Sequence, residues 1–205
     1  MQSLERYLND LASERPTPGG GSAAILVAAC GAALVAMVAR ICAGNPKYAL
    51  HKARADDIAA RADALRTSLM TARERDEAAF EQVVAATSLP RGNDAERAAR
   101  SAELERSLAA AAAEPLQGAQ LALAVLRTAR ELLVIPNRNL SSDIGCAAEF
   151  ARAAVFACAY NVRINHASMK DAAQIGPAAD QIAHAEREAD LLAGEIRTAL
   201  KQQSR

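Results

Sequence analysis

An uncharged segment from Ala23 to Ala39 follows directly after the turn Pro16-Thr17-Pro18-Gly19-Gly20-Gly21-Ser22, and it constrains the fold more than any other feature. The segment approaches the length that spans a membrane. It is rich in alanine and glycine rather than leucine and phenylalanine, and the rest of the chain has the composition of a soluble protein. We therefore expect a central helix that is buried on all sides, and no membrane partner.

The composition of the whole chain favours helices. Apolar residues make up 51% of the 205 residues, whereas aromatic residues make up 3% and tryptophan is absent. Alanine, the main apolar residue here, is the strongest helix former, while strands prefer β-branched and aromatic residues. The length fits one domain with a proper core, so we predict a single domain over residues 1–205.

The spacing of apolar residues and the positions of glycine and proline divide the chain into helices. We predict helices over residues 3–14, from a Ser22 cap to about Ala43, and over residues 47–86, 95–133, 143–168 and 171–202. Pro115 is expected to kink or restart the fourth of these, and Gly176-Pro177 to break the last. The fold class predicted is an all-α helical bundle, with two buried helices rich in small residues surrounded by longer amphipathic helices.

Charge and cysteine content exclude several classes of function. Lys+Arg and Asp+Glu both total 24, so the positive footprint of a nucleic-acid-binding protein is missing and no such partner is expected. The four cysteines, Cys30, Cys42, Cys146 and Cys158, lie in alanine-rich runs without a CxxC pair. We interpret them as small hydrophobic core residues, and expect no metal site. The N-terminus forms a polar amphipathic helix rather than a signal peptide, so a cytoplasmic location is expected.

The glycine-rich turn is the first candidate site. Gly19, Gly20 and Gly21 offer unobstructed backbone N–H groups at the positive end of a long helix, where a carboxylate, a phosphate or a carbonyl oxygen can bind. It is not a P-loop, because no Lys-Ser or Lys-Thr follows and no strand precedes it. A tight turn that needs glycine for its geometry is the alternative, and the two flanking prolines favour the functional interpretation.

Polar residues also gather at both ends of the second small-residue helix. Asn139, Ser142 and Asp143 stand at its start, where Asp143 either complements the helix dipole or acts as a buried carboxylate. Asn161 and Asn165 share one face near its end, and buried amides need partners, which suggests a polar pocket or a hydrogen-bonded contact. Asp76 with Phe80, taken alone, indicates a solvated acid beside a core aromatic residue.

These segments together resemble the cyclodeaminase/cyclohydrolase family, which includes the C-terminal domain of formiminotransferase-cyclodeaminase and bacterial methenyltetrahydrofolate cyclohydrolases. The matching landmarks occur in the family's order over nearly the whole chain: PTPGGGS at 16–22, GAAL at 31–34 with Met37-Val38, Lys47-Tyr48, DEAAF at 76–80, Leu89-Pro90, EPL at 114–116, Asn139 with SDIG at 142–145, and NVRIN at 161–165. Arg40, Cys42, a reduced lysine stretch before Tyr48 and His166 depart from the family's pattern, which bears on the choice of substrate.

The resemblance implies an all-α homodimeric enzyme that acts on a tetrahydrofolate derivative as substrate and uses no separate cofactor. Hydrolysis of 5,10-methenyltetrahydrofolate to 10-formyltetrahydrofolate is favoured, because no formiminotransferase domain is fused to the chain. The alternatives are a lyase-type cyclodeaminase, which closes 5-formiminotetrahydrofolate and releases ammonia, and a non-catalytic folate-binding or assembly protein of the same fold.

The resemblance also implies roles for individual residues. Asp143 is the expected catalytic carboxylate and Asp76 the second acid candidate. The residues expected to bind the substrate lie in the glycine turn, after the first buried helix, and at both ends of the second: Gly19, Gly20, Gly21, Ser22, Lys47, Tyr48, Asn139, Ser142, Asn161, Arg163 and Asn165.

Overall fold

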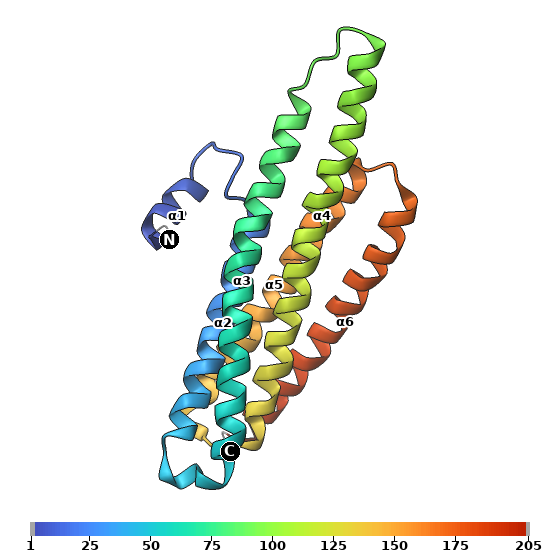
Figure 1. Cartoon of the computed structure of the whole chain (residues 1–205). Helices are drawn as coiled ribbons and strands as arrows, with labels where there is room; N and C mark the ends of the chain where they lie inside the picture. Colours follow the sequence, from blue (N-terminus) through green and yellow to red (C-terminus); the bar gives the residue numbers. More distant parts are fainter. Residues whose placement is uncertain (1–2, 204–205) are drawn as a thin grey trace.

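A computed structural model describes residues 3–203 as a bundle of α-helices (Figure 1). No strand occurs in this part of the chain, and the predicted all-α bundle is confirmed. Six α-helices and three short 3-10 turns follow one another: α1 Leu4–Leu11, α2 Gly20–Ala43, η1 Pro46–His51, α3 Lys52–Thr87, α4 Asp94–Glu131, η2 Leu132–Val134, η3 Arg138–Leu140, α5 Ser141–Ser168 and α6 Ala172–Gln203.

Helices α2, α3, α4 and α5 form the body of the bundle, and α6 packs along α4 and α5. The helix α1 stands apart from the body and is joined to it by the proline-rich turn (Figure 1). Helices α2 and α5 run antiparallel: Gly20 lies beside Asn161, whereas Asn137, just before α5, contacts Cys42 near the end of α2. The start of α2 and the end of α5 therefore meet at one end of the bundle.

Three expected helix boundaries are wrong. The helix α2 begins at Gly20 with Gly19 as its N-cap, so Ser22 lies within the first turn instead of capping it. The helix α4 continues as one helix through Pro115, so the restart expected there does not occur, and α6 continues through Pro177. A proline removes only one backbone donor from a helix, and packing against neighbouring helices can stabilise the rest.

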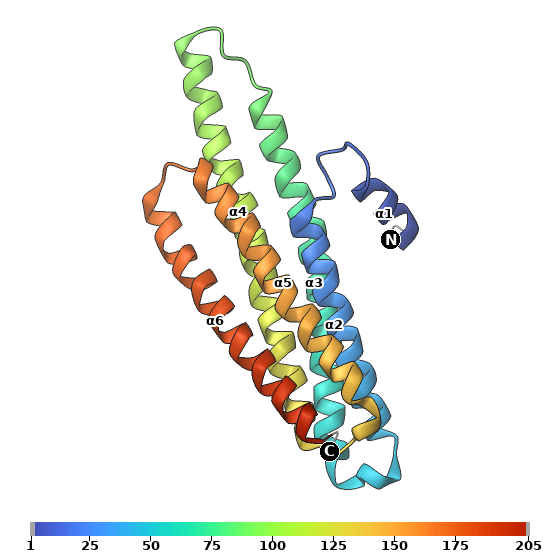
Figure 2. The same ribbon diagram turned by 180° about the vertical axis from the view of Figure 1, so that it is seen from behind.

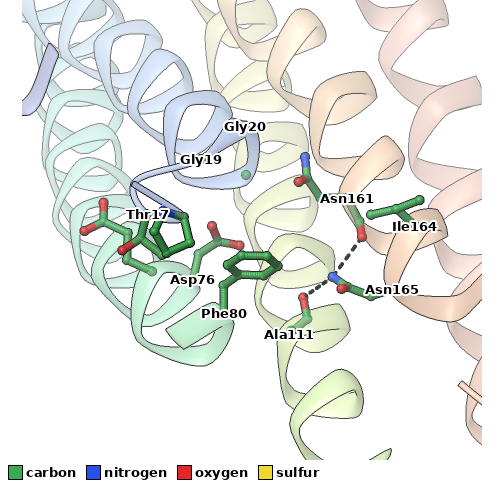
Figure 3. Close-up of a pocket in the computed structure, with 12 residues that line it drawn as sticks. Thr17, Gly19, Gly20, Asp76, Phe80, Ala111, Asn161, Ile164 and Asn165 are labelled. Atoms are coloured by element: carbon green, nitrogen blue, oxygen red, sulfur yellow. Dashed lines mark hydrogen bonds between the residues drawn. The ribbon is translucent and has the colours of Figure 1, made fainter. Parts of the chain in front are cut away.

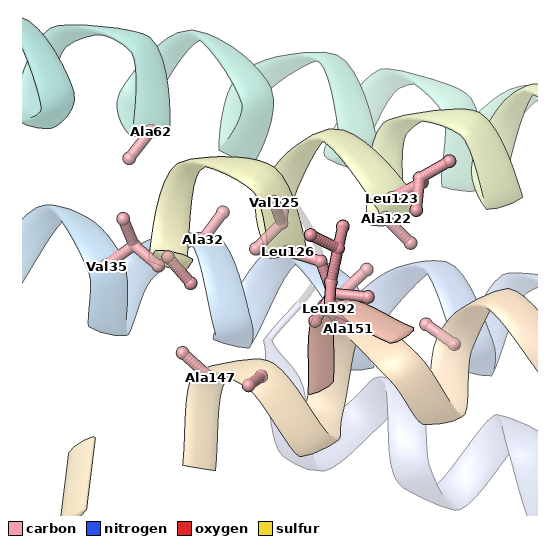
Figure 4. Packing of buried hydrophobic residues seen from close by; sticks show 14 of the residues in the cluster. Ala32, Val35, Ala62, Ala122, Leu123, Val125, Leu126, Ala147, Ala151 and Leu192 are labelled. Carbon is pink, nitrogen blue, oxygen red and sulfur yellow. The ribbon is translucent and has the colours of Figure 1, made fainter. Parts of the chain in front are cut away.

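The core is built from small side chains, which allow the helix axes to approach closely. Figure 4 shows Ala32, Val35, Ala122 and Ala147 among its members. Gly118 on α4 marks one of the tightest contacts, because a Cβ atom added there would lie 2.7 Å from Cγ1 of Ile25. Ile25 is fully buried, so its side chain cannot turn out into solvent to make room.

The uncharged segment predicts a helix buried on all sides, but a single chain leaves one side of α2 exposed. Its length and apolar composition would suffice to span a membrane, but most of it is buried inside the bundle, as expected for the core helix of a soluble protein. One stripe of α2 remains exposed and carries the apolar residues Val27, Cys30, Ala33, Met37 and Ile41, together with Arg40, which forms an ion pair with Asp63. A second exposed apolar stripe runs along the neighbouring α5, and Figure 2 shows the two helices side by side on this face.

Two glycine substitutions test the close packing. Gly118→Ala should destabilise the protein by about 1–3 kcal/mol, because the new methyl group overlaps Ile25 in a core that cannot yield. Gly194→Ala on α6 is the matched control, because a Cβ atom there meets nothing within 4 Å. It should stabilise the helix by about 0.5–1 kcal/mol. Chemical denaturation of both variants measures the difference, and equal effects of the two would contradict the packing argument.

Candidate active site

A cavity of about 130 Å³ lies where the start of α2 meets the end of α5 (Figure 3). The turn before α2 and the helices α3, α4 and α5 all contribute to its wall. The lining residues are Pro16, Thr17, Gly19, Gly20, Gly21, Asp76, Glu77, Phe80, Ala111, Asn161, Ile164 and Asn165. The glycine turn, Asp76 and the two asparagines, which were separate candidates in the sequence, therefore share one pocket.

The carboxylate of Asp76 rests against the first turn of α2. A Cβ atom added at Gly21 would lie 2.7 Å from both carboxylate oxygens, so only glycine permits this approach. The backbone N–H of Ser22 donates a hydrogen bond to the carboxylate, as expected for an anion at a helix N-terminus. The glycine turn thus receives a carboxylate from the protein itself.

Burial raises the pKa of Asp76 to about 6. The Ser22 N–H opposes this shift, whereas the negative charges of Glu77 and Glu114 add to it. A carboxyl group that titrates near neutral pH can accept and return a proton under physiological conditions. The position of Asp76 in a pocket makes it the strongest candidate for acid–base chemistry.

A buried hydrogen-bond network fixes the start of α2 from the opposite side. The Ser22 hydroxyl donates to Oε1 of Glu77 at 2.5 Å and therefore accepts from the Tyr7 hydroxyl at 2.8 Å. Nη1 of Arg73 donates to the same Glu77 oxygen at 2.8 Å, and the guanidinium lies 5.1 Å from the centroid of the Tyr7 ring. Tyr7 is the one buried residue of α1, so this network also attaches α1 to the bundle.

Sequence reasoning missed Tyr7, Arg73 and Glu77. The spacing of Arg73 and Glu77 by four residues was visible, but such pairs are common on solvated helix faces. Phe80, expected in the buried stripe of α3, is 39% exposed and lines the pocket instead.

Pro115 explains the position of Asn165. A proline at position 115 leaves the carbonyl of Ala111, four residues earlier, without its usual helical donor. The Asn165 side-chain amide supplies that donor at 2.8 Å and also donates to the Asn161 carbonyl at 3.0 Å (Figure 3). The Asn161 amide donates in turn to the Ala157 carbonyl at 2.9 Å. Within residues 3–203, neither Oδ1 atom accepts a hydrogen bond, so both are available to a ligand.

The other predicted site residues do not reach this pocket within one chain. Lys47, Tyr48, Asn139, Ser142 and Asp143 lie at the opposite end of the bundle, because α2 and α5 run antiparallel. Asn161 follows Asp143 by 18 positions, which corresponds to about 27 Å along the helix. Arg163 is also directed away, because it forms an ion pair with Glu186 of α6. The single chain therefore separates Asn139, Ser142 and Asp143 from the glycine turn, and the roles expected for them in catalysis and substrate binding stay predictions.

The cysteines divide into two groups. Cys42 and Cys158 are buried, as predicted, and burial raises the pKa of the Cys158 thiol to about 12. Cys30 and Cys146 are exposed on the α2 and α5 stripes, so their assignment to the core is wrong. In the described part of the chain, no three His, Cys, Asp or Glu side chains are grouped so as to hold a metal ion.

The fold and the pocket define a class of protein, an all-α bundle with an ionisable carboxylate in a polar pocket at a helix N-terminus. The sequence matches the family described as formiminotransferase-cyclodeaminase over residues 3–184, and the chain belongs to this family.

The chain is similar in sequence or in fold to several named proteins. The chain is 36% identical over 172 residues to a methenyltetrahydrofolate cyclohydrolase of Methylorubrum extorquens, covering 84% of this chain and 83% of that protein. It is 30% identical over 169 residues to the rat formimidoyltransferase-cyclodeaminase, of whose length it spans 31%. A formiminotetrahydrofolate cyclodeaminase of Thermotoga maritima has the same fold, with a TM-score of 0.88, 24% identity, and coverage of 98% of this chain and 96% of that one.

The pH dependence of stability tests the environment of Asp76. The pKa of this carboxyl is 3.8 in the unfolded chain and about 6 in the folded protein. Its contribution to the stability of the folded state is therefore complete below pH 3.8 and is lost as the pH rises through 6. Asp76→Asn has no carboxyl group to ionise, so it should be more stable than wild type by about 2 kcal/mol at pH 8, with little difference at pH 3.5. Urea denaturation at both pH values measures this, and a difference that does not depend on pH would contradict the shift.

Proposed function

We propose that the protein hydrolyses 5,10-methenyltetrahydrofolate to 10-formyltetrahydrofolate, with Asp76 as the general base. The observation that carries this proposal is the half-buried carboxylate of Asp76. It lies in a pocket beside two free amide oxygens, and its pKa is about 6. The methenyl group is a delocalised cation, and a carboxylate in a poorly solvated pocket stabilises such a charge. The named cyclohydrolase relative supports the same reaction.

The reaction proceeds through proton transfers at one carboxylate. A water molecule attacks the carbon between N5 and N10, and its proton passes to Asp76 as the tetrahedral adduct forms. Asp76 then returns its proton to N5 as the bond between that carbon and N5 breaks. The remaining hydroxyl releases its proton to solvent and becomes the formyl carbonyl on N10, so that one proton is released in each turnover. A single group with a pKa near the working pH can accept the first proton and donate the second.

The two asparagines recognise the polar edge of the pterin ring. Both amide N–H groups of Asn165 and one of those of Asn161 donate to backbone carbonyls. The Oδ1 atoms of the two residues are left to accept from ring N–H groups. Phe80 and Ile164 offer apolar surface to the faces of the ring. A pocket that combines flat apolar walls with a few fixed polar groups is typical of small-molecule sites.

A cyclodeaminase activity is the second candidate. It forms the same kind of tetrahedral carbon, and a carboxylate that cycles its proton can also assist the departure of ammonia. The cyclodeaminase names of the rat and Thermotoga relatives support it. A folate-binding or assembly protein without activity is the third candidate.

Absorbance of methenyltetrahydrofolate distinguishes the three. The proposal expects its decay with purified protein. Its appearance from 5-formiminotetrahydrofolate would assign the cyclodeaminase, and neither change would indicate a binding protein.

Asp76→Asn should lower kcat by about 100-fold or more, since it removes the general base. Asp180→Asn, an exposed acid on α6, is the matched control and should keep wild-type activity. For wild type, kcat/KM should fall about tenfold per pH unit below pH 6, and a flat profile would contradict the role of Asp76.

We propose further that the protein acts as a homodimer that buries the exposed stripes of α2 and α5. Val27, Met37, Ile41 and Phe150 are between 37% and 44% exposed, and Tyr160 and Ile164 are 70% and 67% exposed. Gly31 on α2 lies beside Cβ of Phe150, so the two stripes form one continuous apolar face.

A charge placed on this face tests the dimer. Val27→Glu should shift the protein to a monomer in analytical ultracentrifugation, since a carboxylate is costly to bury without a partner. Leu191→Glu is the matched control, because Leu191 is 61% exposed on α6, outside the face. A monomeric wild-type protein, or dimers of both variants, would contradict the proposed interface.

A further inference from the structure

The first turn of α2 is not secured by its own residues. The N-cap, Gly19, has no side chain to accept a hydrogen bond from the helix, and the helix then opens with Gly20 and Gly21. Glycine loses more conformational freedom on folding than any other residue, and helix ends fray readily. This turn nevertheless forms one wall of the pocket, so contacts from elsewhere in the protein must hold it in place.

Ser22 is the residue through which the turn is held. It is fully buried, and both its backbone and its side chain make contacts. Its N–H donates to the Asp76 carboxylate, while its hydroxyl lies 2.8 Å from the Tyr7 hydroxyl and 2.5 Å from Oε1 of Glu77. Because both groups belong to one residue, a movement that breaks the hydroxyl contacts also displaces the N–H from Asp76.

Tyr7 is the donor at the start of this network. The buried Arg73 forms an ion pair with Glu77, whose Oε1 accepts from both Arg73 and the Ser22 hydroxyl. The Ser22 hydroxyl has only one proton to donate, so it accepts from Tyr7. Burial raises the pKa of Tyr7 above its ordinary value, so at neutral pH its hydroxyl keeps the proton that it donates.

Tyr7 reaches the network from α1, which stands apart from the body of the bundle (Figure 1). It is the one buried residue of that helix, and its ring lies against the Arg73 guanidinium, which holds the ring in place by a cation–π contact. A second side-chain bond from the turn, between Thr17 and Glu81 at 3.1 Å, is exposed and competes with water. The buried contact of Tyr7 is therefore the stronger attachment of the turn.

We propose that Tyr7 is a positioning residue for the reaction. Acting through the hydroxyl of Ser22 and the carboxylate of Glu77, it holds the first turn of α2 so that the Ser22 N–H stays on the Asp76 carboxylate. Tyr7 is not among the residues that line the pocket, so α1 contributes to the site without contacting a ligand there. The inference rests on the proposed role of Asp76 as the general base.

The groups around Asp76 decide the direction of the effect. Burial and the charges of Glu77 and Glu114 raise the pKa of Asp76, whereas the Ser22 N–H lowers it. Loss of that N–H therefore raises the pKa further and leaves less of the base ionised at neutral pH. The titratable and charged groups that surround the carboxyl come from α1, α3, α4 and α5: Tyr7, Glu77, Glu114 and Cys158, with Arg73 and Arg75 paired to the two glutamates.

The pKa of Asp76 tests the proposal without reference to any reaction. An NMR titration of protein with isotope-labelled aspartate follows its carboxyl group, whose signal is identified by its absence from Asp76→Asn. Tyr7→Phe removes the hydroxyl and keeps the ring against Arg73. It should raise the pKa of Asp76 by up to about one pH unit, as expected when a carboxylate loses a hydrogen-bond donor. An unchanged or lowered pKa would overturn the proposal.

A second substitution tests the route of the effect. Ser22→Ala removes the hydroxyl but keeps the N–H, and it should raise the pKa of Asp76 to a similar extent. Tyr7→Phe added to it should cause no further change, because residues that act through one contact are not additive. Thr128→Val is the matched control, since it removes a buried hydroxyl that donates to the Ala124 carbonyl of its own helix. Additive shifts, or the same shift in the control, would argue for general destabilisation and against the proposal.

Kinetics separate the positioning role from the proposed function. At pH 6, kcat/KM of Tyr7→Phe for methenyltetrahydrofolate should be about fivefold below that of wild type, and at pH 8 the two should be nearly equal, because the base is then ionised in both. An equal loss at both pH values would contradict positioning. If the wild-type protein has no folate activity, the proposed function fails, and the NMR titration still decides whether Tyr7 positions Asp76. Circular dichroism of each variant checks that it folds.

Discussion

The close approach of α2 to its neighbours is the constraint on which the rest of the structure depends. Glycine and alanine side chains let α3, α4 and α5 pack directly against its backbone, and the contact between Gly118 and Ile25 leaves no room for another methyl group. The same rule operates at Gly21, where the missing side chain admits the Asp76 carboxylate. Packing and chemistry therefore share one cause, since the pocket exists because α2 begins with residues that have no bulk.

The chemistry of the pocket follows from two local departures from regular structure. The start of α2 leaves backbone N–H groups unpaired, and one of them receives Asp76 while burial raises the pKa of that carboxyl to about 6. In α4, Pro115 frees the carbonyl of Ala111, and Asn165 occupies it with its amide group. The result is an acid of near-neutral pKa beside amide oxygens of fixed orientation, which is the combination that the proposed reaction on a cationic folate needs.

Much of the fold was predictable because helices depend on local patterns. Alanine content, apolar spacing and the glycine and proline boundaries predicted the helices after the glycine turn to within a few residues. The predicted interruptions at Pro115 and Pro177 fail for one reason. Tertiary packing keeps a helix intact even where a proline removes one hydrogen bond. The candidate site was only partly predictable. Taken alone, Asp76 indicated an ordinary solvated acid, and only the family resemblance made it an acid candidate. Tyr7, Arg73 and Glu77 were not singled out as site residues, because a four-residue Arg–Glu spacing is common on solvated helix faces.

The sequence by itself determined the all-helical class, the family resemblance, and the glycine turn as a place where a helix N-terminus receives an anion. These features depend on residue type and short-range spacing, which one chain of letters contains. Only the tertiary structure decided which anion that is, because the direction of α2 relative to α3 and α5 brings Asp76, Asn161 and Asn165 to the turn and takes Asp143 and Lys47 away from it. Helix direction is a long-range property. It places the pocket at one end of the bundle and Asp143 and Lys47 at the other.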